Sequence, residues 1–390
     1  MFKRGLLTAG LLAATFTTAS AGTYGYYDAR SVAMGNVSVA TGGITTAAFA
    51  NPAMLAVNES GETFGFVLGA GLAAIDNGGI IDGVDDFQAL DAQFTDQINN
   101  SQLAEAVATL QQEVDLLNSL NNSSLVLDAN ANTAFIYGGD DYTFALSFKA
   151  NGEASVALQN LYIPAVPVPG DQPTADIYAL GTVTQEIGLS IATRTTLLGM
   201  DVAVGVTPKI VSVEAVDYLV SVDTADVANV TDTTPEDLGS YTSLDAGIVF
   251  RVTDSINAGL IAKNLLEKSF YTTPSPSTPV SRKVEFARFL RAGVSYHNEM
   301  LTLAADLDLT ETDPVLAEDP TKMLSIGMEL DAFDIVQIRA GYQTNTASGA
   351  DNSGDLVSVG VGVWLGFNLD IAAVKSDDSL GAFIQTGFRF

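Results

Sequence analysis

The sequence predicts an all-β protein: a transmembrane antiparallel β-barrel of about 14 strands, with an N-terminal luminal hatch and a helical insert after the first strand. Three observations lead to this prediction. The chain of 390 residues is 47% hydrophobic but only 16% charged, whereas soluble domains usually carry about 25% charged residues. Beyond its N-terminal leader, no segment has the roughly 18 consecutive apolar residues of a membrane helix. Lastly, tight turns and long loops alternate between the predicted strands, as in outer-membrane barrels.

The first 21 residues have the composition of a secretory signal peptide. The basic Lys3 and Arg4 precede an apolar stretch that ends near Phe16, and Ala19-Ser20-Ala21 has the small residues of a cleavage site. An uncleaved anchor is the alternative, but the apolar stretch is too short to span a bilayer. We therefore expect cleavage near Ala21 and transfer to the bacterial outer membrane.

Charge and cysteine content narrow the possible functions. The formal net charge is −29, which argues against binding to nucleic acid through phosphate contacts. The chain has no cysteine, so disulfide and thiolate chemistry are excluded. The single histidine, His297, falls in a predicted tight turn, and no serine or threonine pairs with it convincingly for nucleophilic catalysis. No zinc or calcium spacing is present, so we expect neither an enzyme nor a cofactor or metal site.

Residues 22–58 are rich in small side chains and show little periodicity. We interpret them as an irregular hatch, followed by the barrel at 59–390. Within the hatch, Asn51-Pro52 is a turn signal.

Residues at about 86–121 carry the clear helical pattern of the chain. Apolar residues recur every three or four positions, which places them on one face of a helix; they are Phe87, Leu90, Phe94 and Ile98, then Leu103, Val107, Leu110, Val114 and Leu117. We predict an extracellular helical insert, preceded by a polar loop at 76–86. We favour a structural role, in which the two apolar stripes pack on each other or on the barrel rim. The alternative is a lid or a surface that docks a partner.

The remaining chain alternates apolar and polar residues in segments of strand length. Fourteen strands are predicted, at 62–75, 131–138, 141–150, 180–193, 199–213, 240–252, 255–264, 284–297, 299–310, 321–331, 334–345, 354–366, 368–375 and 379–390. The even-numbered connections are tight, whereas most odd-numbered ones are long, such as 76–130 and 265–283. In a soluble β-sandwich, the length of a connection would not depend on whether it is odd- or even-numbered. Both chain ends then lie on the short-turn, periplasmic side.

Charged residues on the predicted strands share one face, opposite a face of leucine and isoleucine. A charge that faces lipid costs about 2–4 kcal/mol at the bilayer midplane, so this face must line the lumen. Neighbouring strands then place four charges in one luminal region, where opposite charges pair across the wall; they are Arg291, Asp306, Glu329 and Arg339. This network either selects solutes at a constriction or fills the barrel structurally.

The last strand ends on an aromatic residue after alternating apolar positions. One of its faces carries Leu380, Ile384, Phe388 and Phe390, and this pattern is similar to the C-terminal signal of bacterial outer-membrane barrels. We expect the barrel assembly machinery to recognise Phe388 and Phe390. The strand should close the sheet against 62–75, with its apolar face in outer-membrane lipid.

Several segments resemble known families. ARSVAMGNVSVATGG and FANPAML, which contains Asn51, Pro52 and Ala53, resemble the N-terminal region of the FadL-like outer-membrane barrels. This resemblance implies an Asn-Pro-Ala hatch inside a fourteen-stranded barrel. Later segments are similar to the barrel-type family of conjugal transfer protein TraF, among them GVTPKIVSV, LAADLDLT, RAGYQTN and the terminal GAFIQTGFRF. The chain cannot be the thioredoxin-like pilus-assembly protein of the same name, because it has no cysteine.

Three functions follow as hypotheses. The family resemblance implies a component associated with plasmid conjugation in the outer membrane. The FadL-like resemblance implies a passive channel for small hydrophobic compounds, which would be its ligands. The acidic loops and helical insert would also suit a scaffold that recruits a conjugation, envelope or secreted protein partner.

Overall fold

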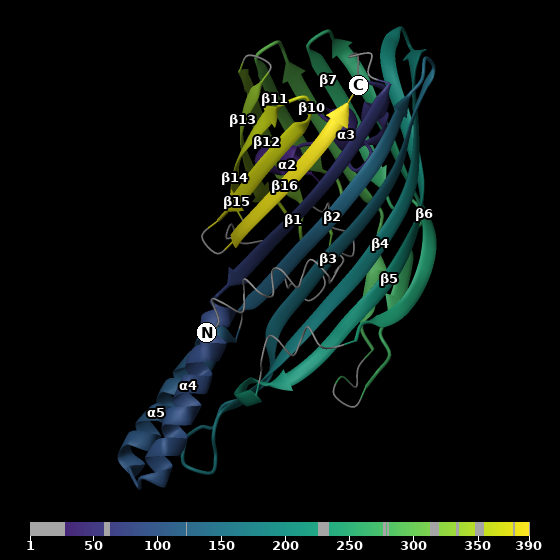
Figure 1. Ribbon diagram of the computed structural model, residues 1–390. Coiled ribbons are helices and arrows are strands. Elements are labelled where there is room, and N and C mark those ends of the chain that lie inside the picture. Colours follow the sequence, from purple (N-terminus) through teal and green to yellow (C-terminus); the bar gives the residue numbers. More distant parts are fainter. Residues whose placement is uncertain are drawn as a thin grey trace.

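The computed structural model describes residues 28–57, 63–121, 123–224, 234–275, 278, 281–312, 320–332, 335–347, 355–376 and 379–389. The predicted signal peptide at 1–21, its cleavage near Ala21, and the terminal Phe390 lie outside the described residues. Helices and strands carry the labels of Figure 1.

Fourteen strands form a closed antiparallel barrel, as the sequence predicts (Figure 1). β16 closes the sheet against β1, and Phe388 lies opposite Phe66 in this ladder. The barrel strands are β1 (Phe64–Asn77), β2 (Ser124–Gly138), β3 (Tyr142–Tyr162), β4 (Thr174–Leu197), β5 (Met200–Ser221), β6 (Glu236–Thr253), β7 (Ile256–Lys263), β10 (Phe289–His297), β11 (Leu301–Asp308), β12 (Met323–Ala332), β13 (Val336–Asn345), β14 (Leu356–Trp364), β15 (Asn368–Lys375) and β16 (Ser379–Arg389).

The barrel is taller on one side than on the other. β3, β4 and β5 have 21, 24 and 22 residues, whereas β7, β11 and β15 have 8 each. The tight turns lie at one end, together with the end of β16, and the long connections lie at the other (Figure 1). Since outer-membrane barrels place short turns in the periplasm, the long strands extend on the extracellular side.

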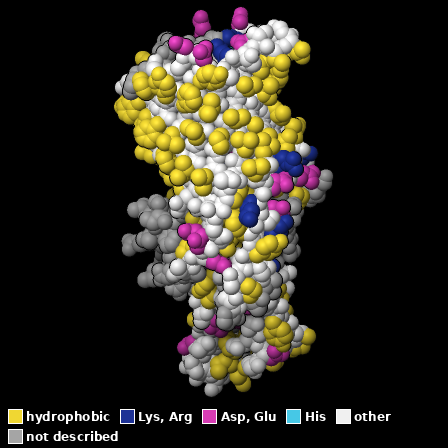
Figure 2. Space-filling model, turned by 90° about the vertical axis from the view of Figure 1, so that its right-hand side faces the viewer, with side chains coloured by type: hydrophobic (Ala, Val, Ile, Leu, Met, Phe, Trp, Pro, Cys, Tyr) yellow, Lys and Arg dark blue, Asp and Glu magenta, His cyan; other side chains and the backbone are white. Residues whose placement is uncertain are grey.

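The two faces of the wall differ in polarity as predicted. In β11, Leu303 and Leu307 are 42% and 41% exposed, whereas Asp306 and Asp308 are 2% and 3% exposed. Apolar side chains gather over the upper part of the surface, at the short-turn end (Figure 2). Because strand side chains alternate between faces, the exposed apolar set faces lipid and the charged set faces the lumen.

One predicted strand, 284–297, is two separate strands. β9 (Lys283–Phe286) pairs with β8 (Lys268–Tyr271) in a two-stranded sheet, and only β10 belongs to the barrel. The loop predicted at 265–283 therefore contains a strand. The alternation of apolar and polar residues is the same in β9 and β10, so period two alone could not show the break. The apolar residues of the small sheet pack against the inner wall; the cluster includes Phe270, Val284, Phe286, Val211, Val213 and Tyr241.

The helical insert is a hairpin of α4 (Ile80–Asn99) and α5 (Leu103–Leu120). α4 begins earlier than predicted, because the Asp76 carboxylate accepts hydrogen bonds from Ile80 N (2.7 Å) and Ile81 N (3.3 Å). The predicted polar loop at 76–86 is therefore largely helix. No described helix is long and apolar enough to cross a membrane.

The hairpin packs on itself and on the outer face of the extended strands. Phe94, Ala106 and Leu110 fill the space between the two helices. Ile80, Val84, Phe87 and Leu117 pack against a cluster that includes Leu125 of β2 and Ile177 of β4. Ile177 lies on the same side of β4 as the exposed Ile187 and Leu189. Two residues of the predicted stripe do not join this packing, since Leu103 and Val107 are 61% and 41% exposed.

Candidate functional site

The N-terminal residues 28–57, here called the hatch segment, contact the inner wall of the barrel. They comprise α2 (Ala29–Ala33), α3 (Ile44–Ala47) and the 3-10 helix η2 (Pro52–Ala56). Asp28 begins α2 by accepting a hydrogen bond from Ser31 N (2.7 Å). Gly35 and Asn36, with φ of 69° and 64°, reverse the chain after this helix. Most hatch side chains are buried, and α2 and α3 lie inside the barrel near the short-turn end (Figure 1).

Asn51, Pro52 and Ala53 form the start of η2. The Asn51 side chain accepts a hydrogen bond from Ala53 N (3.1 Å) and donates one to Val39 O (2.8 Å), which ties two parts of the hatch together. Pro52 suits the first helical position, where a backbone N–H would have no helical partner. Gly247 of β6 faces the motif so closely that a β-carbon there would overlap Asn51 Oδ1. The motif therefore lies directly against the wall.

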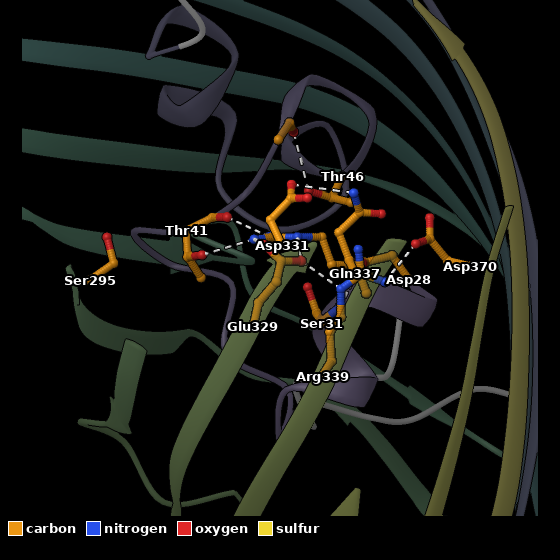
Figure 3. Close-up of polar contacts among 12 residues, drawn as sticks. Asp28, Ser31, Thr41, Thr46, Ser295, Glu329, Asp331, Gln337, Arg339 and Asp370 are labelled. Atoms are coloured by element: carbon orange, nitrogen blue, oxygen red, sulfur yellow. Dashed lines mark hydrogen bonds and ion pairs between the residues drawn. The ribbon is translucent and has the colours of Figure 1, made fainter. Parts of the chain in front are cut away.

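Glu329 of β12 joins the hatch to the wall (Figure 3). Its two carboxylate oxygens accept hydrogen bonds from Arg30 Nε (2.9 Å) and Nη2 (2.8 Å). Oε2 also accepts from Arg339 Nε (2.5 Å), across the β12–β13 ladder, and Arg339 reaches Asp370 of β15 at 2.6 Å. Arg30 additionally donates to Thr41 O (2.5 Å). The structure thus brings Glu329 and Arg339 together and adds two partners that sequence reasoning missed.

The remaining two predicted luminal charges, Arg291 and Asp306, have separate roles. Arg291 lies opposite Asp308 in the β10–β11 ladder and forms an ion pair with it. Asp306 Oδ2 instead accepts two backbone hydrogen bonds from the hatch, from Ser38 N (2.7 Å) and Val39 N (3.0 Å). The expected pairing across the wall therefore needs a correction at Asp306, because this carboxylate is directed at the hatch.

A second set of luminal charges lies on β3 to β7, and sequence reasoning missed it. Glu186 of β4 pairs with Lys149 of β3 (2.6 Å) and Lys209 of β5 (3.1 Å). Lys209 also pairs with Asp245 of β6 (2.9 Å), and Lys263 of β7 donates to a hatch carbonyl at 2.8 Å. Together the two sets of luminal charges comprise Lys149, Glu186, Lys209, Asp245, Lys263, Arg291, Asp306, Asp308, Glu329, Arg339 and Asp370. Signs alternate around much of the wall, so the charges largely neutralise one another.

The hatch is held differently on its two sides. Toward β1–β6 it is seated in a large apolar cluster, which includes Phe49, Met54, Leu55, Val67, Ala134, Ile136, Ala145, Ala192, Ala203 and Val249. Toward β10–β14, polar contacts are prominent: Ser295 Oγ donates to Ala40 O (2.7 Å), and Ser358 Oγ accepts from Gly35 N (2.9 Å). Smaller apolar clusters also lie on this side, one of them formed by Met34, Val37 and Ala304. The two sides therefore differ in how much of the contact with the hatch is apolar.

The end of β16 lies at the short-turn end of the barrel. Phe388 is 41% exposed and packs on Phe367, with 5.7 Å between ring centroids. The guanidinium carbon of Arg389 lies 4.8 Å from the Trp364 ring centroid. Aromatic residues are enriched at membrane–water interfaces, and this cluster fits the periplasmic one. The assembly role of Phe388 and Phe390 remains a prediction.

The closed fourteen-stranded barrel, its apolar exterior and the segment in its lumen define an outer-membrane β-barrel with an N-terminal segment inside it. More particularly, the chain belongs to the family described as "F plasmid transfer operon, TraF, protein". The model of that family matches residues 48–308, which is more than half of the chain. No protein with a curated description matches the chain in sequence.

Solved structures with this fold include two hydrocarbon channels. One is the toluene transporter TbuX of Ralstonia pickettii, with 14% identity and a TM-score of 0.55, over 93% of this chain and 98% of that one. The other is TodX, in a form described as a deltaS2S3 mutant monoaromatic hydrocarbon channel, with 12% identity and a TM-score of 0.56, over 93% of this chain and 99% of that one. At these identities the likeness concerns the fold.

Proposed function

We propose that this protein is a hatch-gated channel that carries small hydrophobic molecules across the outer membrane. The observation that carries the proposal is the asymmetric seating of the hatch segment. A large apolar cluster of the hatch lies against β1–β6, and the hydrogen bonds of Asp306 and Glu329 hold its other side. Opening then needs movement of the hatch against the wall rather than loss of the barrel.

The extracellular half of the lumen supports an apolar solute. Tyr241, Phe270 and Phe286 lie on one another there, with ring centroids 5.2 to 6.1 Å apart. Ligand pockets are mostly lined by apolar and aromatic side chains; in this cluster Tyr241 is partly exposed, whereas Phe270 and Phe286 are buried. TbuX and TodX, which share the fold, are described as a toluene transporter and a monoaromatic hydrocarbon channel.

A disulfide between hatch and wall tests the proposal. A β-carbon at position 387 would lie 3.8 Å from Thr45 Cβ, which is near the mean Cβ–Cβ separation of a disulfide. The chain has no cysteine of its own, so Thr45→Cys with Gly387→Cys gives one defined bridge. Cells that lack other hydrocarbon channels would express the barrel, and entry of radiolabelled toluene would be measured.

Wild type should admit toluene faster than cells without the barrel. The double variant should be slow when oxidised and recover after reduction, whereas each single variant should be insensitive to redox state. Equal entry in cells with and without the barrel would refute the channel. Equal entry in the oxidised and reduced double variant would refute hatch movement at Thr45.

The family match favours a second candidate, a component of plasmid conjugation in the outer membrane. The extracellular hairpin of α4 and α5, with Leu103 and Val107 exposed, would then meet an envelope or secreted protein partner. Deletion of the gene in a host with a conjugative element should lower transfer frequency. Complementation with a barrel that lacks 80–120 separates the two candidates, since toluene entry should survive and transfer should not.

A further inference from the structure

The helical hairpin contacts the extracellular end of β5, where the chain continues into the short 3-10 helix η3 (Val222–Thr224). The Gln88 side chain of α4 donates a hydrogen bond to Val222 O (3.0 Å). The Val222 side chain is fully buried in the apolar cluster that Phe87 and Leu117 of the hairpin share with the wall. The hairpin therefore has a defined contact with the wall on the extracellular side.

A buried carboxylate lies at this contact. Glu113 of α5 is one helical turn before Leu117 and only 1% exposed, and its Oε1 has no hydrogen-bond partner among the described residues. The charged groups that act on it are also acidic, namely Asp91 of α4 and Asp223 of η3. The sequences of α4, α5 and η3 contain no lysine, arginine or histidine. These elements therefore offer no cation that could balance the carboxylates.

Ionisation of Glu113 opposes the contact. A buried charge without a partner is costly, because the protein does not replace the water that the carboxylate loses. Burial, followed by the charges of Asp91 and Asp223, raises the pKa of the Glu113 carboxyl from 4.5 to about 7. Burial and then the charge of Asp223 also raise the pKa of the Asp91 carboxyl. Loss of the Glu113 proton thus places a further negative charge beside two other carboxyl groups.

The hairpin can leave the wall as a folded unit. Phe94, Ala106 and Leu110 pack α4 and α5 on each other and form a cluster separate from the one at β5. The chain enters α4 through Gly78 and Gly79, whose φ angles of 89° and 73° are adopted readily by glycine. Two adjacent glycines at this junction allow the hairpin to change its angle to β1.

We propose that the helical hairpin docks on the end of β5 in acid and leaves it as the pH rises, with Glu113 as the proton-binding group. In the released hairpin this carboxylate regains water, and its pKa returns toward the ordinary value of 4.5. The docked state thus binds a proton that the released state gives up between pH 4.5 and about 7. Docking is therefore strongest below pH 4.5 and weakens as the pH rises to about 7.

Single cysteines can report whether the contact is open, because the chain has no cysteine of its own. Val222→Cys places a thiol at the wall beneath the hairpin, and Leu110→Cys places one between α4 and α5. Ala108→Cys places one on the exposed face of α5. The purified full-length barrel is treated with a water-soluble maleimide, and each labelling rate is divided by that of Ala108→Cys at the same pH. This ratio removes the intrinsic pH dependence of thiol reactivity.

The relative labelling of Val222→Cys should rise about 10- to 100-fold between pH 5 and pH 8, because the proton of Glu113 is lost in this range. Glu113→Gln should remove the rise, since an amide does not ionise. Glu105→Gln, at an exposed position of the same helix, is the matched control and should keep it. At pH 8 Val222→Cys should react well before Leu110→Cys, because the hairpin leaves the wall without unfolding.

Equal relative labelling of Val222→Cys at pH 5 and pH 8 would overturn the proposal, as would a rise that survives in Glu113→Gln. Equal labelling of Val222→Cys and Leu110→Cys at pH 8 would also overturn it, because the hairpin would then unfold as a whole. Ala175→Cys, at another buried wall position of the same cluster, takes the place of Val222→Cys if that variant does not fold. Toluene entry is not measured, so the channel is judged separately.

Discussion

Glu329 lies directly opposite Arg339 in the β12–β13 ladder, and the same carboxylate is held by Arg30 of the hatch segment. One side chain therefore links two wall strands to the segment in the lumen. All three side chains are mostly buried, with exposed fractions of 2% to 16%. Removal of one partner from a buried ion pair is costly, because the other charges stay desolvated.

Glu329→Gln should loosen the hatch. Loss of a buried partner typically costs about 3–5 kcal/mol, so release of the hatch, followed by protease cleavage within 28–57, should become correspondingly easier. Glu267→Gln is the control, since its pair with Arg288 is about half exposed and such pairs contribute about 0–1 kcal/mol. Equal hatch protection in the two variants would show that Glu329 does not hold it.

Gly247→Ala should displace the Asn51-Pro52-Ala53 motif from β6. The added methyl group would overlap Asn51 Oδ1, and the Asn51 carboxamide is held in place by its hydrogen bonds with Val39 O and Ala53 N. Protease sensitivity of the hatch should rise while the barrel keeps its heat-modifiable migration on gels. Gly43→Ala provides the comparison, because its φ of −84° suits alanine and its β-carbon would meet no atom within 4 Å. A protected hatch in Gly247→Ala would contradict the close approach.

Glu113 should make the helical hairpin more stable in acid. Burial in α5, then the charges of Asp91 and Asp223, raise the pKa of the Glu113 carboxyl from 4.5 to about 7. The folded hairpin thus binds a proton that the unfolded hairpin releases between these values, so stability falls as pH rises from about 4.5 to 7. Protection factors of the α5 amides, which correct for the intrinsic pH dependence of hydrogen exchange, should be higher at pH 5 than at pH 8.

Glu113→Gln should remove most of this pH difference, because the amide does not ionise. Glu105→Gln, near the start of the same helix, should keep it. A pH dependence that is the same in Glu113→Gln and wild type would assign the effect to another group.

Phe390→Ser should impair assembly into the outer membrane. The exposed Phe388 lies two positions before it on the lipid-facing side of β16, and alternate residues share a face. Heat-modifiable barrel should fall several-fold in membranes, while Phe383→Leu, on the luminal face, should assemble nearly normally. Normal levels of the Phe390→Ser barrel would remove the proposed role of the terminal aromatic.

The alternation of apolar and polar residues, and of short and long connections, was sufficient to predict the barrel. Every strand has lipid on one side and a polar lumen on the other, so every strand carries the same pattern. They could not choose between Asp306 and Asp308 as the partner of Arg291, since both aspartates face inward and only register separates them. Nor could they connect Arg30 with Glu329, which are 299 positions apart in the chain. The signal for Lys149 and Glu186 was present, since both occupy luminal positions of their strands.

The unequal strand lengths place the helical hairpin far from the lipid. The 24 residues of β4 cover about 80 Å along the strand, or roughly 55 Å of height at a tilt near 45°, of which the lipid band takes about 25 Å. The helices α4 and α5, beside the extracellular ends of these strands, therefore stand about 30 Å above the lipid band. A molecule that approaches from outside meets the hairpin before it meets the lipid.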